Sequence, residues 1–186
     1  MKHLLTIILT FNLIFLVAQT NEIQKFQKDV VQGQLMKYEG ETKISSSIDS
    51  AWMADILMRT NSDSTENSLI FKSTNSIDSI VLTEIERDLI FSFFKNPKNL
   101  ELTVNPTKFD TIDINKVLDH LRKNHDNQIV FISQPLFIRQ GKIGIVFFAN
   151  LCCGHIYGHV NFSFYLQENS IWTRWIDMSS GAYKKN

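Results

Sequence analysis

The side chains best suited to chemistry gather in residues 151–159, which read Leu-Cys-Cys-Gly-His-Ile-Tyr-Gly-His. This junction holds both cysteines of the chain and two of its five histidines, namely Cys152, Cys153, His155 and His159. A thiol beside a histidine can act as a nucleophile, and a histidine can act as a general base. One hypothesis is therefore a hydrolase or isomerase with its Cys/His site at this junction.

The same four side chains are ligand types that zinc accepts. Neighbouring residues on a strand point to opposite faces, so the adjacent Cys152 and Cys153 diverge. Structural zinc sites separate paired ligands by two to four residues. The spacing therefore predicts no metal and no cofactor, and it favours two thiols in a glycine-assisted turn over a strained vicinal disulfide.

Four β-segments surround the junction and must position it. They are residues 129–139, 142–153, 159–167 and 170–178. In residues 159–167 apolar and polar side chains alternate, which is typical of an antiparallel strand with one buried and one solvated face. The connections are short, and short turns join antiparallel neighbours. We expect a meander of about four strands.

Helices are expected ahead of this meander. Thr83 and Glu86 form a capping box for a helix over residues 84–95. Asp113 is an N-cap for a second helix, which has basic residues in its last turn. A short helix is also expected over residues 51–59, where apolar side chains form one stripe.

The remaining segments carry weaker patterns. Apolar residues between 21 and 38 fit one helical face that Gly33 interrupts. Residues 40–50 read as a serine-rich connector, residues 69–82 as a hairpin, and residues 100–104 as a further strand. The fold class predicted is α+β, with N-terminal helices packed on a C-terminal antiparallel meander, like nuclear-transport-factor or cystatin-like architectures.

The N-terminus has the pattern of a signal peptide. A short basic start, with Lys2, precedes an apolar run over residues 4–17, and about 14 apolar residues suit a signal peptide better than a membrane span. We expect residues 1–19 to be cleaved and residues 20–186 to form a single globular domain. The protein is then exported, either periplasmic or secreted, with no stable membrane insertion after cleavage.

The charge balance narrows the class of partner. The chain has 19 basic and 19 acidic residues, and cleavage would remove one lysine. A nearly neutral chain lacks the basic surface that nucleic acid or an anionic membrane attracts. The expected partner is an unknown protein or a small ligand, not nucleic acid.

Aromatic residues of the last two strands suggest where such a ligand binds. Regular alternation places Trp172 and Ile176 on one face of the last strand and Trp175 on the other. If one sheet face is solvated, one tryptophan is exposed there. Tyr157, Tyr165 and Trp175 are the ligand-binding residues predicted from this pattern.

The C-terminal third resembles small exported proteins of Bacteroidetes-type bacteria with no assigned function. The resemblance covers about 50 residues and rests on short motifs: residues 132–137 (Ile-Ser-Gln-Pro-Leu-Phe), Cys153-Gly154, Gly158-His159 and Trp172. It implies export, and it supplies no catalytic residues to carry over to this chain. The adjacent Cys152 and Cys153 depart from its pattern, in which spaced cysteines are expected, and this puts a disulfide in doubt.

Three functions are compatible with these patterns. The first is a non-enzymatic exported binding module that uses its sheet face. The second is the Cys/His hydrolase or isomerase described above. The third is a periplasmic inhibitor or immunity-type protein, which rests on size and export.

Overall fold

A computed structural model describes residues 21, 23–35, 42–45, 48, 70–73, 76–95, 109–124, 127–152 and 157–180, with backbone alone for 157, 158, 179 and 180. The signal segment expected over residues 1–19, the helix expected over 51–59 and the strand expected over 100–104 lie outside these residues.

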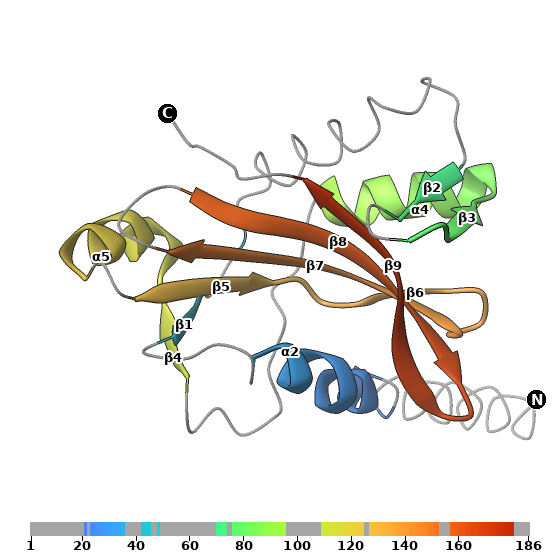
Figure 1. The fold of residues 1–186 in the computed structure, drawn as a ribbon, viewed down its shortest axis with the longest axis horizontal. Coiled ribbons are helices and arrows are strands. Elements are labelled where there is room, and N and C mark those ends of the chain that lie inside the picture. The colour runs from blue at the N-terminus through green and yellow to red at the C-terminus, as the bar shows by residue number, and fades with distance from the viewer. Residues whose placement is uncertain are drawn as a thin grey trace, which may run out of the picture.

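The centre of the fold is a mixed sheet of seven strands (Figure 1). The order is β4 (Asp110–Ile112), β1 (Thr42–Ser45), β5 (Gln128–Ile132), β7 (Ile143–Cys152), β8 (Tyr157–Glu168) and β9 (Ile171–Ser180), with β6 (Leu136–Ile138) also paired to β7. The pairs from β5 through β7 and β8 to β9 are antiparallel, whereas β1 runs parallel to both β4 and β5. Helices and strands are combined as the α+β prediction requires. The predicted sheet of about four antiparallel strands is corrected to seven strands in a mixed sheet.

The strands β1 and β4 are the part of the sheet that the sequence did not indicate. Residues 40–50 were expected to be a connector, yet Thr42–Ser45 forms β1 between β4 and β5. A strand of four residues has too few positions to show a period of two, and its pairing joins it to residues far along the chain. Pairing with β4 and β5 therefore makes residues 42–45 a strand.

Helices cover both faces of the sheet (Figure 1). Residues 23–35 form the N-terminal helix on one face, including the π-helical η1 (Gln27–Gln32) and ending in α2 (Gly33–Leu35). The opposite face packs against α4 (Glu84–Lys95), α5 (Val117–Lys123) and the hairpin of β2 (Ile70–Lys72) and β3 (Ser79–Val81). A 3-10 turn, η2 (Ile114–Lys116), leads into α5.

This arrangement produces two hydrophobic cores. The larger lies between the sheet and α4, α5 and the hairpin, and it holds Phe162 and Phe164 of β8. The smaller lies between the sheet and the N-terminal helix, and it holds Tyr165 and Trp172. The predicted solvated face of β8 is corrected at Ser163 and Tyr165, which are 1% and 5% exposed beneath the helix, whereas His159 on the same face is exposed.

A β-bulge corrects the predicted faces of β9. Phe164 pairs with Ile176 and Tyr165 pairs with Arg174, so Trp175 is an extra residue without a direct partner on β8. The bulge shifts the alternation by one position. Trp172 therefore lies in the smaller core and Ile176 in the larger one, instead of sharing a face.

The structure confirms the predicted caps at the starts of α4 and η2 and the predicted hairpin. The Thr83 backbone N–H donates to Glu86 Oε2 at 2.9 Å, and the Glu86 N–H donates to Thr83 Oγ1 at 3.2 Å. Asp113 caps η2 by accepting from the Asn115 N–H at 2.8 Å. The hairpin expected within residues 69–82 forms as β2 and β3. These features depend on residues close in sequence.

Acid is expected to weaken the start of α4. The hydrogen bond from Arg139, together with bonds from Thr83, holds the pKa of Glu86 below its ordinary value of 4.5 against the opposing effect of burial. A lowered native pKa contributes stability that is present above pH 4.5 and is lost as pH falls through the native pKa. Glu86→Gln should therefore lose less stability than the native chain on acidification.

Urea unfolding followed by circular dichroism at neutral pH and at about pH 3 would measure this difference. Glu84→Gln is the matched control, because Glu84 is an exposed carboxylate in the same helical turn. Equal acid sensitivity of the two variants would contradict a stabilising role for the contact between Glu86 and Arg139.

Gly144 on β7 allows the N-terminal helix to approach the sheet. A Cβ at this position would lie 2.6 Å from Cε2 of the Phe26 ring, closer than packed atoms can sit. Gly144→Ala should lower the free energy of unfolding by about 1–3 kcal/mol through overpacking. Gly33→Ala is the control, because an added Cβ there meets nothing within 4 Å. In the helix, that change should raise stability by about 0.5–1 kcal/mol. Thermal and urea unfolding of both variants would show opposite signs, and two changes of the same sign would contradict the packing.

Candidate functional site

The predicted Cys/His site is only partly within the described structure. Cys152 ends β7 and is half-buried, and His159 is exposed on β8. Cys152 pairs with Tyr157, and His159 pairs with Asn150, so the two side chains are diagonal neighbours on one sheet face. Cys153 and His155 lie outside the described residues.

The described geometry does not bring Cys152 and His159 into catalytic contact. Within the described ranges, no hydrogen bond joins His159 to a thiol or to a carboxylate, which a general base requires. Nor do three or more His, Cys, Asp or Glu side chains gather as metal ligands in that part of the chain. The catalytic role of Cys152, Cys153, His155 and His159 stays a prediction.

The predicted aromatic surface is divided between the two sides of the sheet. Tyr165 faces the N-terminal helix, whereas the half-buried Trp175 packs against the larger core. For Tyr157 the structure describes only the backbone. Tyr165 and Trp175 therefore do not form one surface. Tyr165 instead lines a pocket.

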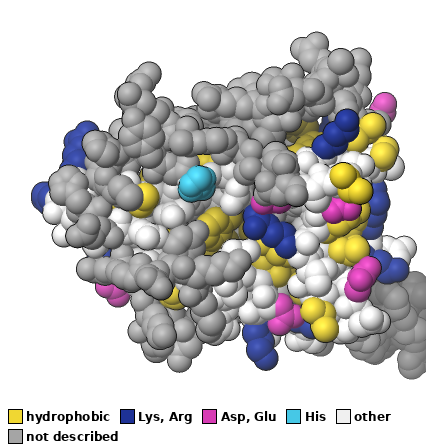
Figure 2. Space-filling view, in the orientation of Figure 1, with side chains coloured by type: hydrophobic (Ala, Val, Ile, Leu, Met, Phe, Trp, Pro, Cys, Tyr) yellow, Lys and Arg dark blue, Asp and Glu magenta, His cyan; other side chains and the backbone are white. Residues whose placement is uncertain are grey.

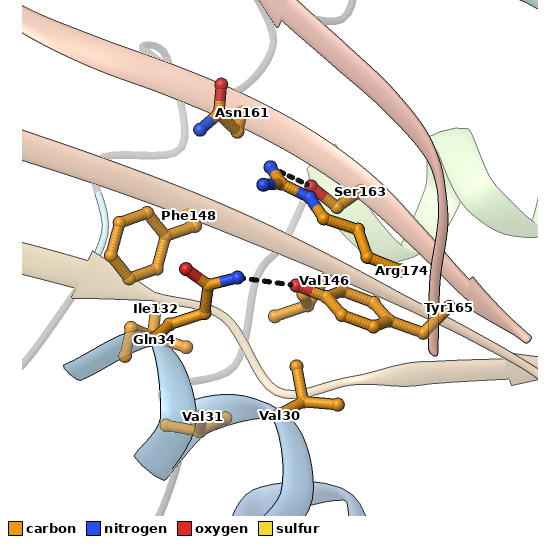
Figure 3. A pocket seen from close by; sticks show the side chains of 10 residues that line it. All are labelled: Val30, Val31, Gln34, Ile132, Val146, Phe148, Asn161, Ser163, Tyr165 and Arg174. Carbon is orange, nitrogen blue, oxygen red and sulfur yellow. Dashed lines mark hydrogen bonds between the residues drawn. The ribbon is translucent and has the colours of Figure 1, made fainter. Parts of the chain in front are cut away.

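This pocket lies between the N-terminal helix and the sheet (Figure 3). It has a volume of about 60 Å³ and is partly open to solvent. Its lining residues come from the helix and four strands: Val30, Val31, Gln34, Ile132, Val146, Phe148, Asn161, Ser163, Tyr165 and Arg174. One side of the pocket is aliphatic and aromatic, and the other side is polar.

The polar side is organised by Arg174. Its Nη2 donates to Asp177 Oδ1 at 2.6 Å and to Ser163 Oγ at 3.1 Å. Ser163 Oγ in turn donates to Asp177 Oδ1 at 2.8 Å. The side chains of Arg174 and Asp177 are 35% and 13% exposed, so the ion pair borders solvent at one end.

The β-bulge makes this ion pair possible. Residues three apart on a regular strand point to opposite faces. Because Trp175 is an extra residue, Arg174 and Asp177 point to the same face of the sheet. They lie there beside their partners on β8, Tyr165 and Ser163. A local irregularity of β9 thus builds the polar side of the pocket.

Donor groups in the pocket remain available to a ligand. A guanidinium has five N–H groups, and in the described part of the chain only Nη2 of Arg174 has protein partners. The Asn161 carboxamide likewise has no hydrogen-bond partner among the described residues. Figure 3 shows the Arg174 guanidinium between the Asn161 and Gln34 side chains. Nε, Nη1 and the Asn161 amide are therefore free to bind an acceptor.

Tyr165 adds a hydroxyl to the same space. Its oxygen accepts from Gln34 Nε2 at 3.3 Å. Burial raises the pKa of Tyr165 above its ordinary value of 10, Asp177 adds to the rise, and Arg174 and Gln34 oppose it. The phenol therefore keeps its proton at neutral pH and can donate a hydrogen bond to a ligand.

Sequence reasoning identified Tyr165 but not the rest of this pocket. The signal that could have found it was the run of polar side chains at alternate positions of β8, Asn161 and Ser163 among them. Those positions were assigned to solvent, since nothing in β8 shows that a helix more than 120 residues earlier covers them.

Comparison with protein-family models, curated proteins and solved structures gives no match to this chain. In the described part of the chain, no helix is long and apolar enough to cross a membrane.

Proposed function

We propose that this chain is an exported, non-enzymatic binding protein whose ligand site is the pocket between the N-terminal helix and the sheet. The supporting observation is that Asp177 and Ser163 bind Nη2 of Arg174, while its Nε and Nη1 groups have no partner among the described residues. Fixed donors beside an apolar wall are typical of a small-molecule site.

Binding is favoured over catalysis by the groups in the pocket. Ser163 donates to Asp177, but it is 1% exposed, and the described residues that line the pocket include no histidine to act as its base. A tyrosine with a raised pKa is a poor general base at neutral pH. What the pocket offers is a set of oriented donors.

Export and fold type belong to the same proposal. Cleavage after residues 1–19 would place the new N-terminus just before the helix that covers the pocket. The resemblance to exported Bacteroidetes-type proteins supports this location. The curved sheet with a helix across one face is proposed to be of the nuclear-transport-factor or cystatin-like type, with β5, β7, β8 and β9 as its meander.

A fragment screen tests the proposed site. The probe is a panel of small anionic, neutral polar and cationic molecules, and the readout is the amide NMR spectrum of the purified protein. We expect shifts that cluster on Ser163, Tyr165 and Arg174. Asn161→Phe should abolish them by filling the pocket, whereas the control Asn115→Phe changes an exposed residue on η2 and should not.

Two results would contradict the proposal. One is a panel in which no fragment shifts the pocket resonances. The other is binding that maps elsewhere and survives Asn161→Phe.

A further inference from the structure

The donors that face the pocket converge from three strand positions. Arg174 on β9 supplies Nε and Nη1, Asn161 on β8 supplies its carboxamide, and Tyr165 on β8 supplies its O–H. Figure 3 shows these side chains around one space beside Phe148. A carboxylate has two oxygens and about four acceptor positions, and a guanidinium matches it in a plane. Such a group can use all of these donors.

The charge of the site disfavours a ligand with more than one negative charge. Asp177 lies 2.6 Å from Arg174, so one positive charge is already balanced before a ligand binds. Among the described residues, no other Lys or Arg side chain lines the pocket. A bound monoanion gives the site a net charge of about −1, and a dianion such as a phosphate ester would raise this to about −2, which costs more in a partly buried site.

The size and the apolar wall limit the rest of the ligand. A pocket of about 60 Å³ takes only a small group of a few non-hydrogen atoms. The wall opposite the donors is formed by aliphatic side chains of the helix and sheet, with the Phe148 ring: Val30, Val31, Ile132, Val146 and Phe148. A carboxylate with a short aliphatic chain fills this shape.

We infer that the pocket binds a short-chain aliphatic monocarboxylate, with the carboxylate on Arg174 and Asn161 and the chain against Val146 and Phe148. This inference rests on the proposed function and specifies its ligand class. The Tyr165 hydroxyl donates a hydrogen bond to the same carboxylate. Arg174 and Asn161 are binding residues, and Asp177 and Ser163 are positioning residues.

Titration with matched probes tests the ligand class. Propionate, propionamide, methylphosphonate and hexanoate are titrated into the purified protein in a buffer without carboxylates, with amide NMR shifts as the readout. Propionate should saturate with shifts at Tyr165 and Arg174. Propionamide should bind about tenfold or more weakly, because it loses charge-assisted hydrogen bonds.

Variants separate recognition from folding. Arg174→Lys keeps a positive charge beside Asp177 but loses the forked donors, and it should weaken propionate binding about tenfold or more. Asn161→Ala removes a rim side chain that holds no other described residue, so it tests the site even if the lysine variant unfolds. Arg122→Met, at an exposed arginine of α5, is the control and should bind as the native chain does.

Each contrary outcome has a defined meaning. Equal or tighter binding of propionamide or methylphosphonate overturns the monocarboxylate class, and hexanoate binding tenfold tighter than propionate overturns the short chain. Propionate binding that survives both Arg174→Lys and Asn161→Ala overturns the assigned contacts. If propionate does not bind while another fragment shifts the pocket resonances, only the ligand class is contradicted. If no fragment shifts them, the proposed function is contradicted as well.

Discussion

Phe26→Ala is expected to lower the free energy of unfolding by about 3–5 kcal/mol, the range for a fully buried phenylalanine. The Phe26 side chain is 0% exposed. Its ring makes edge-on contacts with Phe137, Tyr165 and Trp172 at centroid distances of 5.7, 5.4 and 5.1 Å. It is the main anchor of the N-terminal helix on the sheet, and the alanine variant leaves a cavity among these rings.

Urea unfolding followed by circular dichroism measures this loss. Ile23→Ala is the matched control, because Ile23 lies in the same helix but is 36% exposed. A surface change of this kind is expected to cost at most about 0.5 kcal/mol. If the two variants were equally stable, the helix would not be docked on the sheet and the pocket would lose one of its walls.

Asp177→Ala is expected to be the second most damaging change, at about 2–3 kcal/mol. It removes the acceptor for both Arg174 and the buried Ser163, and a buried polar group without a partner is costly. The range lies below the 3–5 kcal/mol of a fully buried ion pair because the Arg174 side chain is 35% exposed and stays partly solvated. The free energy of unfolding from urea titration is the measurement.

The control for this change is Asp119→Ala. Asp119 forms an ion pair with Arg122 at 3.8 Å, but the two side chains are 74% and 68% exposed. Such surface pairs contribute about 0–1 kcal/mol. Similar losses for both aspartate variants would show that the network of Asp177 does not hold β8 and β9 together.

Features that depend on neighbouring residues could be predicted from the sequence. Thr83 and Glu86 cap α4, Asp113 caps η2, and the hairpin of β2 and β3 pairs as expected. Each of these depends on hydrogen bonds or side-chain periods within a few residues. The larger core side of β8, with Phe162 and Phe164, was also identified, because a period of two is visible within one strand.

The candidate site could not be predicted in the same way. Of its polar residues, Tyr165 was identified as a ligand residue, but Arg174 and Asp177 were not connected. Their common face depends on a one-residue bulge at Trp175, and β9 contains no glycine or proline that would mark a bulge in its sequence. The junction at residues 151–159 has reactive residue types next to one another in sequence, but neighbouring residues on a strand point to opposite faces.

The sequence by itself determined the α+β class, the capped helix α4, the cap of η2, and the alternation of β8. The tertiary structure alone decided that the second face of β8 is covered, that β1 and β4 join the sheet, and that Arg174, Asp177 and Tyr165 share one pocket. The physical reason is the range of the interactions involved. Caps and periods are local, whereas Phe26 reaches Gly144 and Gln34 reaches Tyr165 across more than 100 residues of chain.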